Sequence, residues 1–368
     1  MRIGFGAADD ARGSNSSAQR TSCVLSISHD AAVSIPKSPF SRLGGRSGCG
    51  GPRNHYGISD WGDSKIVQTV GSSGEVVNVS QPTVSIVVPA YLRGRAGLEL
   101  LDVQLAALAE QRDAPEFEVL VADNDSPVDV RAHLAEHPLR ESLRLRHIEA
   151  TAVRGASYAR NAGAASATGE YVLFCDHDDR VYPEWIARLV GFLGEGYDVV
   201  GSAVEGRTLN AANPRGAVEL PAPENFQSPG VFAPQVVGCS MGVRAAVYRK
   251  LGGLDTSYAA NEDIEFGWRA HREGYRVGFL PEALVAYRYR RGLHAGYRQG
   301  RPRGVGLARL HAEFPGNGLP EPRLPLLLLS LAAVSANLRL TGEERGLLLG
   351  ITVGQLLGGI RYRTLHWR

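Results

Sequence analysis

Cysteine is scarce in this chain, which has four among 368 residues. Two of them lie within the first 81 residues, and the other two, Cys175 and Cys239, lie in strand-like segments. This pattern excludes a disulfide framework and suits a reducing compartment. The charges nearly balance, at a net +2, so we expect no nucleic-acid partner for the chain as a whole.

Long apolar runs are also missing. The short segment 24–27 is too small for the core of a signal peptide, so a cytoplasmic location is expected. Two leucine-rich stretches, 324–340 and 347–360, are interrupted by proline, glycine and polar residues and fall short of the ~20 apolar residues that span a bilayer. Two alternatives remain for residues 320–368. They pack on the preceding domain or another subunit, or they make a peripheral contact with the inner face of the membrane.

Residues 1–81 are rich in Ser, Gly and Arg and lack apolar periodicity, which predicts a disordered extension. From residue 82 the pattern changes to alternating strands and helices. The expected strands are 84–91, 117–122, 143–148 and 170–176, and the expected helices between them are 97–112 and 158–167. This order predicts an α/β fold with a mostly parallel sheet flanked by helices.

Acidic side chains gather where two of these strands end. Asp176, Asp178 and Asp179 follow one strand, and Asp123 and Asp125 follow another. Parallel strands of open sheets end where ligands bind, and carboxylates this close repel one another unless a cation lies between them. An all-oxygen site suits Mg²⁺ or Mn²⁺, so Asp176, Asp178 and Asp179 are the predicted metal ligands.

Other residues suit a nucleotide. Asp123 can accept a hydrogen bond from the imide N–H of a base, and Tyr91 at the neighbouring strand end offers a face for stacking. Arg160 opens a helix, where its guanidinium can meet nucleotide oxygens or hold the Asp176 cluster together. A second acidic pair, Glu262 and Asp263, begins an amphipathic helix, where capping alone is the simpler alternative.

Five segments stand in the order found in one family: 84–91, 123–126, 159–163, 169–179 and 261–269. Together they resemble the inverting glycosyltransferases of family 2, which have the GT-A fold. The resemblance covers residues 82–300, which leaves 301–368 as a basic, apolar helical appendage. It implies transfer of a sugar from a nucleotide-diphosphate donor, UDP-linked, to an acceptor hydroxyl, with inversion and metal assistance. The acceptor is a sugar, a lipid-linked group or a natural product.

The resemblance also implies residue roles. Asp263 corresponds to the general base, with Glu262 as its neighbour or substitute. The implied nucleotide-binding residues are Pro89, Tyr91, Asp123, Asp125, Arg160 and Asp176. One position departs from the family, because Ala286 stands where many relatives have a metal-binding histidine. His294 is a candidate substitute.

Two alternatives belong to other classes. A phosphohydrolase of the haloacid dehalogenase type also places Asp-x-Asp at a strand end, but it expects Thr or Val where Arg180 stands. A non-catalytic nucleotide-sugar-binding protein would keep the fold with an idle base, and the intact acid clusters argue against it.

Overall fold

The structure is a computed structural model that describes residues 69–70, 76–77, 83–211 and 232–367. Contacts divide the chain into Met1–Val67 and Gln68–Arg368, and the described residues all belong to the second unit. The sequence predicts disorder for residues 1–81, and nearly all of that range lies outside the described residues. Its described part consists of two short strands, β1 (Thr69–Val70) and β2 (Val76–Val77), which pair antiparallel.

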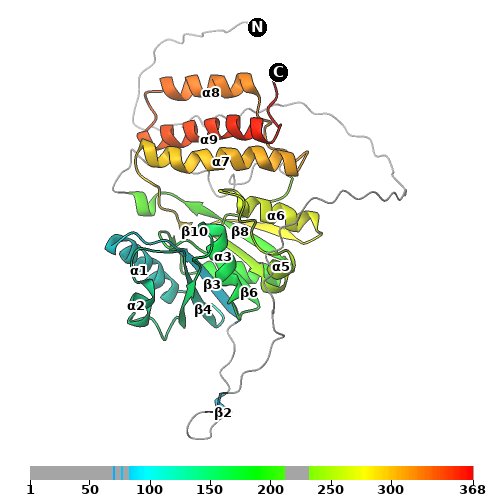
Figure 1. The fold of residues 1–368 in the computed structure, drawn as a ribbon. Helices are drawn as coiled ribbons and strands as arrows, with labels where there is room; N and C mark the ends of the chain where they lie inside the picture. The colour runs from blue at the N-terminus through cyan, green and yellow to red at the C-terminus, as the bar shows by residue number, and fades with distance from the viewer. Residues whose placement is uncertain (1–68, 71–75, 78–82, 212–231, 368) are drawn as a thin grey trace, which may run out of the picture. The chain divides into compact units, whose positions relative to one another are not determined.

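An eight-stranded sheet forms the centre of this unit, in the order β5-β4-β3-β6-β9-β8-β10-β7 (Figure 1). β9 runs antiparallel to both β6 and β8, and β7 runs antiparallel to β10, while the other neighbouring pairs are parallel. The strands are β3 (Val84–Ala90), β4 (Phe117–Asp123), β5 (Leu145–Glu149), β6 (Tyr171–Phe174), β7 (Arg180–Val181), β8 (Val199–Glu205), β9 (Met241–Arg244) and β10 (Val277–Ala286).

Helices connect the strands and extend beyond the last one. The helices that flank the sheet are α1 (Arg95–Ala109), α2 (Val130–Ala135), α3 (Ala156–Ala165), α4 (Trp185–Gly194), α5 (Ala245–Lys250) and α6 (Glu262–Arg272), with a short 3₁₀ turn η1 (Thr208–Asn210) after β8. Three more helices follow β10, namely α7 (Leu293–Glu313), α8 (Leu324–Ala336) and α9 (Gly342–Arg361).

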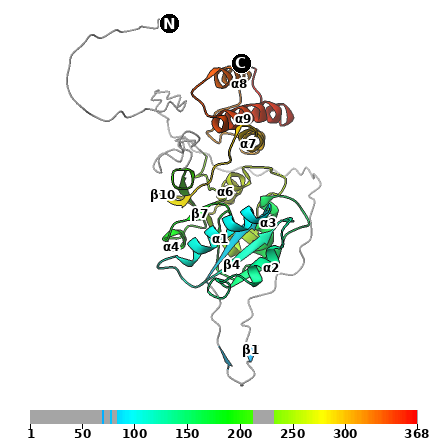
Figure 2. The same cartoon turned by 90° about the vertical axis from the view of Figure 1, so that its left-hand side faces the viewer.

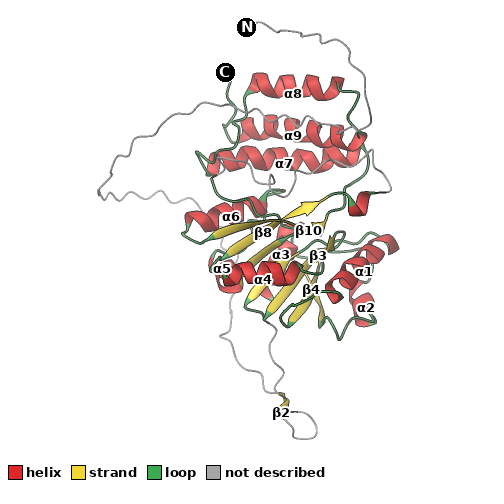
Figure 3. Ribbon diagram, turned by 180° about the vertical axis from the view of Figure 1, so that it is seen from behind, coloured by secondary structure: helices red, strands yellow, loops and turns green. Residues whose placement is uncertain are grey.

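Two apolar cores lie on the two faces of the sheet. Alternate residues of β3 point to opposite faces, so Ile86 belongs to the core that includes residues of α1 and α4, and Val87 to the core that includes residues of α3, α5 and α6. Figures 1 and 3 show α3 in front of the sheet and α4 behind it. The expected α/β fold with a mostly parallel sheet between helices is confirmed.

The C-terminal helices are stacked outward from α6, in the order α7, α9, α8 (Figures 1 and 2). α7 packs on α6 through a small core that includes Trp268, Leu310 and Phe314. α7 also runs through residue 300 without a break, so the predicted start of the appendage at 301 falls inside a helix. None of the helices in the described part of the chain combines the length and apolar content that crossing a bilayer needs.

Candidate functional site

The turn after β6 carries the acidic cluster, and buried polar groups fix its shape. Gln104 of α1 is fully buried, donates to the carbonyl oxygen of Asp176 at 3.0 Å and accepts from the N–H of Val181 at 3.0 Å. From the other side, the backbone N–H of Arg288 donates to Asp179 Oδ1 at 2.8 Å, and Arg288 Nε donates to the carbonyl oxygen of Asp178 at 2.8 Å. The turn is therefore held between α1 and the segment after β10.

Arg160 joins this cluster to the second acidic pair. Its guanidinium is buried, and it donates to Asp176 Oδ1 at 2.6 Å and to Glu262 Oε1 at 3.0 Å. Burial alone would lower the pKa of Arg160, but Asp176, Glu262 and the neighbouring Asp263 together raise it above its ordinary value. The guanidinium thus stays charged between two acidic segments that lie 86 positions apart in the sequence, at Asp176 and Glu262.

Glu262 and Asp263 differ in accessibility although they are adjacent. Glu262 is buried, and burial, followed by the charge of Asp263, raises its pKa, while Arg160 acts in the opposite direction. Asp263 is half-buried, and its Oδ2 accepts from the backbone N–H of Gly238 at 2.7 Å. Asp263 is therefore the more solvent-accessible carboxylate of the pair.

The direction of β9 brings a further residue to the cluster. Because β9 runs antiparallel to β6, the segment before it, which includes Cys239, returns to the edge where β6 ends. One oxygen each from Asp176 and Asp179 and the sulfur of Cys239 lie within 4.8 Å of one another. Cys239 was not among the metal ligands predicted from the sequence, since strand direction is not readable from composition.

The donor atoms in this cluster fit a divalent cation. Burial raises the pKa of Asp179 well above its ordinary value, and Asp176 and Asp178 raise it further. Asp179 Oδ2 is buried and has no hydrogen-bond partner among the described residues. A bound cation would satisfy this oxygen and offset the repulsion between the carboxylates.

The predicted nucleotide side lies at the ends of β3 and β4. Pro89 is buried in β3, and its carbonyl oxygen lies 3.2 Å from His177 Nδ1. Tyr91 is 37% exposed, and the guanidinium of Arg154 lies 6.0 Å from its ring and 2.5 Å from Asp125. A half-exposed aromatic ring therefore sits beside a guanidinium at the edge where a nucleotide is expected.

Asp123 and Asn124 shape the loop at this edge. Asp123 Oδ1 accepts from the N–H of Ser126 at 3.0 Å, and His147 Nε2 lies 3.5 Å from Oδ2. Asn124, which the sequence analysis missed, donates to the carbonyl oxygens of Ala150 and Val153 and accepts from the N–H of Gly155. It thus fixes the 150–155 loop that leads into α3.

The histidine missing from the family pattern is not replaced nearby in the described residues. Ala286 is fully buried at the end of β10 and offers no ligand atom. His294 is exposed near the start of α7 and belongs to neither group of potential metal ligands found in the described ranges. Tyr287 follows Ala286, and burial raises its pKa to about 12.

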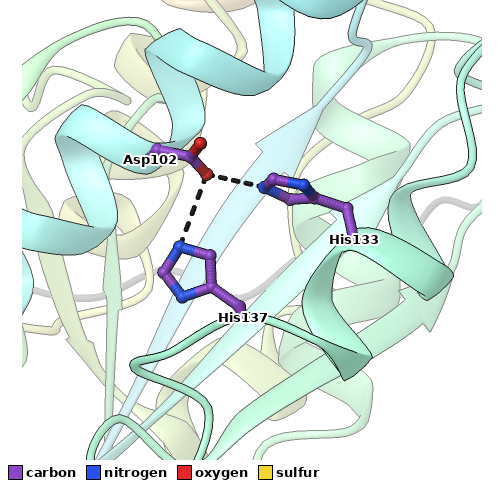
Figure 4. A group of neighbouring side chains, drawn as sticks. All are labelled: Asp102, His133 and His137. Carbon is purple, nitrogen blue, oxygen red and sulfur yellow. Dashed lines mark hydrogen bonds and ion pairs between the residues drawn. The ribbon is translucent and has the colours of Figure 1, made fainter.

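A second group of potential ligands lies apart from this site, between α1 and the end of α2 (Figure 4). His133 Nε2 is 2.6 Å and His137 Nε2 is 3.4 Å from Asp102 Oδ1. The backbone N–H of Leu139 donates to His137 Nδ1 at 3.2 Å, so the proton of a neutral His137 lies on Nε2 and faces Asp102. A metal on Nε2 would need that proton on Nδ1, so this geometry favours a hydrogen-bonded tether between the two helices.

The tether lines a hollow of about 480 Å³, together with residues of α1 and of the segment that follows α2. The residues that line it are Asp102, Ala106, His133, Glu136, His137, Pro138 and Leu139.

Residues 85–252 match the family model described as Glycosyl transferase family 2. This segment belongs to glycosyltransferase family 2. It includes Asp123, Arg160 and the Asp176 cluster, and it ends before Glu262 and Asp263.

Individual relatives of the chain are distant. It is 26% identical over 288 residues to the pre-mycofactocin glycosyltransferase of Mycobacterium tuberculosis, which covers 76% of this chain and 57% of that protein. It is 33% identical over 127 residues to the undecaprenyl-phosphate 4-deoxy-4-formamido-L-arabinose transferase of Klebsiella pneumoniae, covering 34% of this chain and 37% of that protein. The chain thus spans little more than half the length of the mycobacterial relative.

Among solved structures, the mannosyltransferase PcManGT of Pyrobaculum calidifontis in complex with GDP-Man and Mn²⁺ has a TM-score of 0.48 and 22% sequence identity, and the match covers 78% of this chain and 73% of that one.

Proposed function

We propose that this chain transfers a hexosyl or related sugar from a nucleotide-diphosphate donor, UDP-linked, to an acceptor hydroxyl with inversion. The observation that supports it most is the bridge that Arg160 makes between Asp176 and Glu262, at 2.6 Å and 3.0 Å. Through it, the carboxylates suited to a cation and the helix start that carries the proposed base, Asp263, meet at one buried guanidinium. Residues 82–300 are the proposed catalytic domain.

The nucleotide end of the donor is assigned to the edge formed by β3 and β4. Tyr91 would stack on the base, and Asp123 would accept from its imide N–H. Pro89 and Asp125 lie at the same edge, and Asp125 holds Arg154 at 2.5 Å next to the ring of Tyr91. Arg160 and Asp176 would lie beside the diphosphate, toward the reacting centre.

Asp263 is assigned as the general base. Glu262 is already bound to Arg160 and is buried, whereas Asp263 is half-buried and held in place by Gly238. Asp263 would take the proton from the acceptor hydroxyl as its oxygen forms a bond to the anomeric carbon. The bond from that carbon to the diphosphate oxygen breaks, and the electron pair leaves with the nucleoside diphosphate. Attack from the face opposite the leaving group inverts the configuration.

Asp176, Asp178 and Asp179 are the proposed ligands of a divalent cation, and Cys239 lies within reach of two of them. When bound, Mg²⁺ or Mn²⁺ supplies Lewis-acid stabilisation of the charge on the leaving diphosphate. Thiol sulfur is a poor partner for Mg²⁺, so a ligand set that includes Cys239 would favour Mn²⁺.

The acceptor class is proposed from the relatives. The mycobacterial relative is named for pre-mycofactocin and the Klebsiella relative for undecaprenyl-phosphate. We therefore propose natural-product and lipid-linked acceptors, with free sugars as a third class, in the cytoplasm.

Calorimetric titration with UDP, GDP and their diphospho-sugars, with and without Mn²⁺, tests the donor. Asp263→Asn tests the chemistry, because it should bind the donor with wild-type affinity and lose turnover by about 100-fold or more. Wild-type turnover in Asp263→Asn, or loss of donor affinity alone, would remove Asp263 from the base role. Donor binding without transfer to any acceptor class by the wild type would favour a non-catalytic binding protein.

A further inference from the structure

Helix α8 is apolar around its whole circumference and is nevertheless largely uncovered. Its sequence, LPLLLLSLAAVSA, contains no charged residue. Leu327 alone is buried within the helix, whereas Leu326, Leu328 and Leu329 are 49%, 53% and 65% exposed. A helix that is apolar on all sides is stable when an apolar environment surrounds it, and water does not provide one.

α8 is not buried because the two helices beneath it, α7 and α9, pack against each other and not around it. α7 and α9 pack so closely that a Cβ on Gly300 would come within 2.2 Å of the carbonyl oxygen of Leu347, and a Cβ on Gly350 within 2.5 Å of that of Tyr297. These two helices therefore bury their glycine faces against each other. α8 lies on the far side of α9 from α7 and forms the outermost layer (Figures 1 and 2). The α7–α9 pair thus supports α8 from beneath and leaves its outer side exposed.

Both ends of α8 carry groups suited to a lipid headgroup region. At its start, Arg323 pairs in a β-bridge with His366, and Trp367 next to it is 75% exposed. After its end, Leu338 is 90% exposed and is followed by the exposed Arg339. Tryptophan and arginine at the borders of an apolar helix are typical of segments that lie in a membrane interface.

We propose that α8 inserts into the interface of an anionic bilayer, with its axis along the surface and the α7–α9 pair as its support. The exposed residues Leu326, Leu328 and Leu329 do not form one narrow stripe, because they are spread over about 160° of the helix at 100° per residue. A partner helix covers a narrower stripe, whereas acyl chains cover a broad convex face. Arg339 provides complementarity to anionic headgroups, and at the other end Arg323, whose guanidinium lies 3.6 Å from Glu321, stays half-exposed at the same border. This inference does not depend on the proposed function.

Flotation of the full chain with vesicles tests it. Phosphatidylcholine vesicles and vesicles with added phosphatidylglycerol are compared at low and high salt. We expect flotation with the anionic vesicles at low salt and less at high salt. Leu329→Glu should weaken vesicle binding by about tenfold or more, because it places a charge where the acyl chains would cover an exposed leucine.

Val103→Glu is the matched control. Val103 is an apolar residue of α1 with 41% exposure, and it lies in the sheet-flanking layer rather than the helical one. Val103→Glu should float like the wild type, and both variants should keep the wild-type melting temperature. The fluorescence of Trp367 should shift to the blue on vesicle binding, and Trp367→Phe should remove that change.

Three results would overturn the proposal. The first is the absence of flotation with anionic vesicles at low salt, and the second is equal flotation of the wild type and Leu329→Glu. The third is a dimer in light scattering that Leu329→Glu dissociates while vesicles leave it unchanged, which would make a second copy of the chain the partner of α8. Nucleotide titration of the same variants separates this test from that of the proposed function, since loss of flotation need not affect donor binding.

Discussion

At the scale of single residues, one guanidinium is shared among several carboxylates. Arg160 contacts Asp176 and Glu262, and Asp263 lies close enough to raise its pKa. Taking one partner away from a buried pair leaves an uncompensated charge and is strongly destabilising. Variants of Asp176 therefore mix an effect on stability with any effect on a bound cation, and Asp178 gives the cleaner test.

Asp178→Ala should lower the rate of metal-dependent transfer by about 100-fold or more and leave the fold intact. The charge of Asp178 adds to the raised pKa of Asp179, so its removal relieves repulsion. The measurement combines transfer assays over a Mn²⁺ titration with thermal melting. Wild-type turnover of Asp178→Ala in chelator-treated buffer would contradict the metal assignment.

The sequence identified the acids of this site as candidates because they follow recognisable strands. For Arg160 it left two alternatives, contact with nucleotide oxygens and contact with the Asp176 cluster. The structure shows the bond to Asp176 and adds a bond to Glu262 that the sequence did not predict. Cys239 was missed because its position depends on the antiparallel direction of β9, which no local pattern encodes. Gln104 had a readable signal, since it is a polar residue on the same helix face as Leu101, Leu105 and Leu108, all of them buried.

At the scale of elements, a buried carboxylate links β3, β4 and β5 at the ends of the strands opposite to the site. Glu118 of β4 accepts from Ser85 of β3 at 2.7 Å, from the N–H and hydroxyl of Thr168 at 2.9 and 2.6 Å, and from Arg146 of β5 at 2.7 Å. Burial alone would raise the pKa of Glu118, but these hydrogen bonds outweigh it and lower the pKa from its ordinary value of 4.5.

Glu118→Gln should therefore lower the free energy of unfolding at neutral pH by about 2 kcal/mol, because it removes charge-assisted hydrogen bonds. A lowered carboxyl pKa stabilises the fold above the unfolded pKa, and this stabilisation is lost as the pH falls through the folded pKa. Denaturant titrations should show the difference between wild type and variant shrinking below pH 4.5.

Glu99→Gln is the control for this measurement, because Glu99 is 62% exposed in its pair with Arg95 and should contribute little. An equal loss of stability in both variants, or a difference that does not depend on pH, would contradict the role of Glu118.

The strands and helices of the sheet were largely predictable, whereas the C-terminal helices were not. β3 and β4 are β-branched runs whose composition identifies them, and their observed bounds agree with the expected ones to within a residue. For the two leucine-rich stretches the sequence left packing and membrane contact as alternatives. In the structure α9, which includes the second stretch, packs on α7. This packing depends on glycines of both helices, and their role is visible only when the two helices are seen together.

At the scale of the whole described unit, α7 connects the sheet domain to the helical layer. Its C-terminal half packs against Trp268 of α6, and its glycines pack against α9. The sheet domain and the outer helices are therefore joined by continuous packing through one helix, and a defect between α7 and α9 should affect the stability of the unit.

Gly350→Ala tests that packing with one added methyl group. The new Cβ would lie 2.5 Å from the carbonyl oxygen of Tyr297 and 2.8 Å from the amide nitrogen of Arg301, so α7 and α9 must separate. We expect the free energy of unfolding to fall by about 1–3 kcal/mol and the melting temperature to fall by about 2–5 °C.

Gly191→Ala in α4 is the matched control, because nothing lies within 4 Å of its added Cβ. It should instead raise stability by about 0.5–1 kcal/mol, the usual gain of alanine over glycine in a helix. If Gly350→Ala also raised the melting temperature, the close contact between α7 and α9 would be wrong, and with it the support assigned to α8.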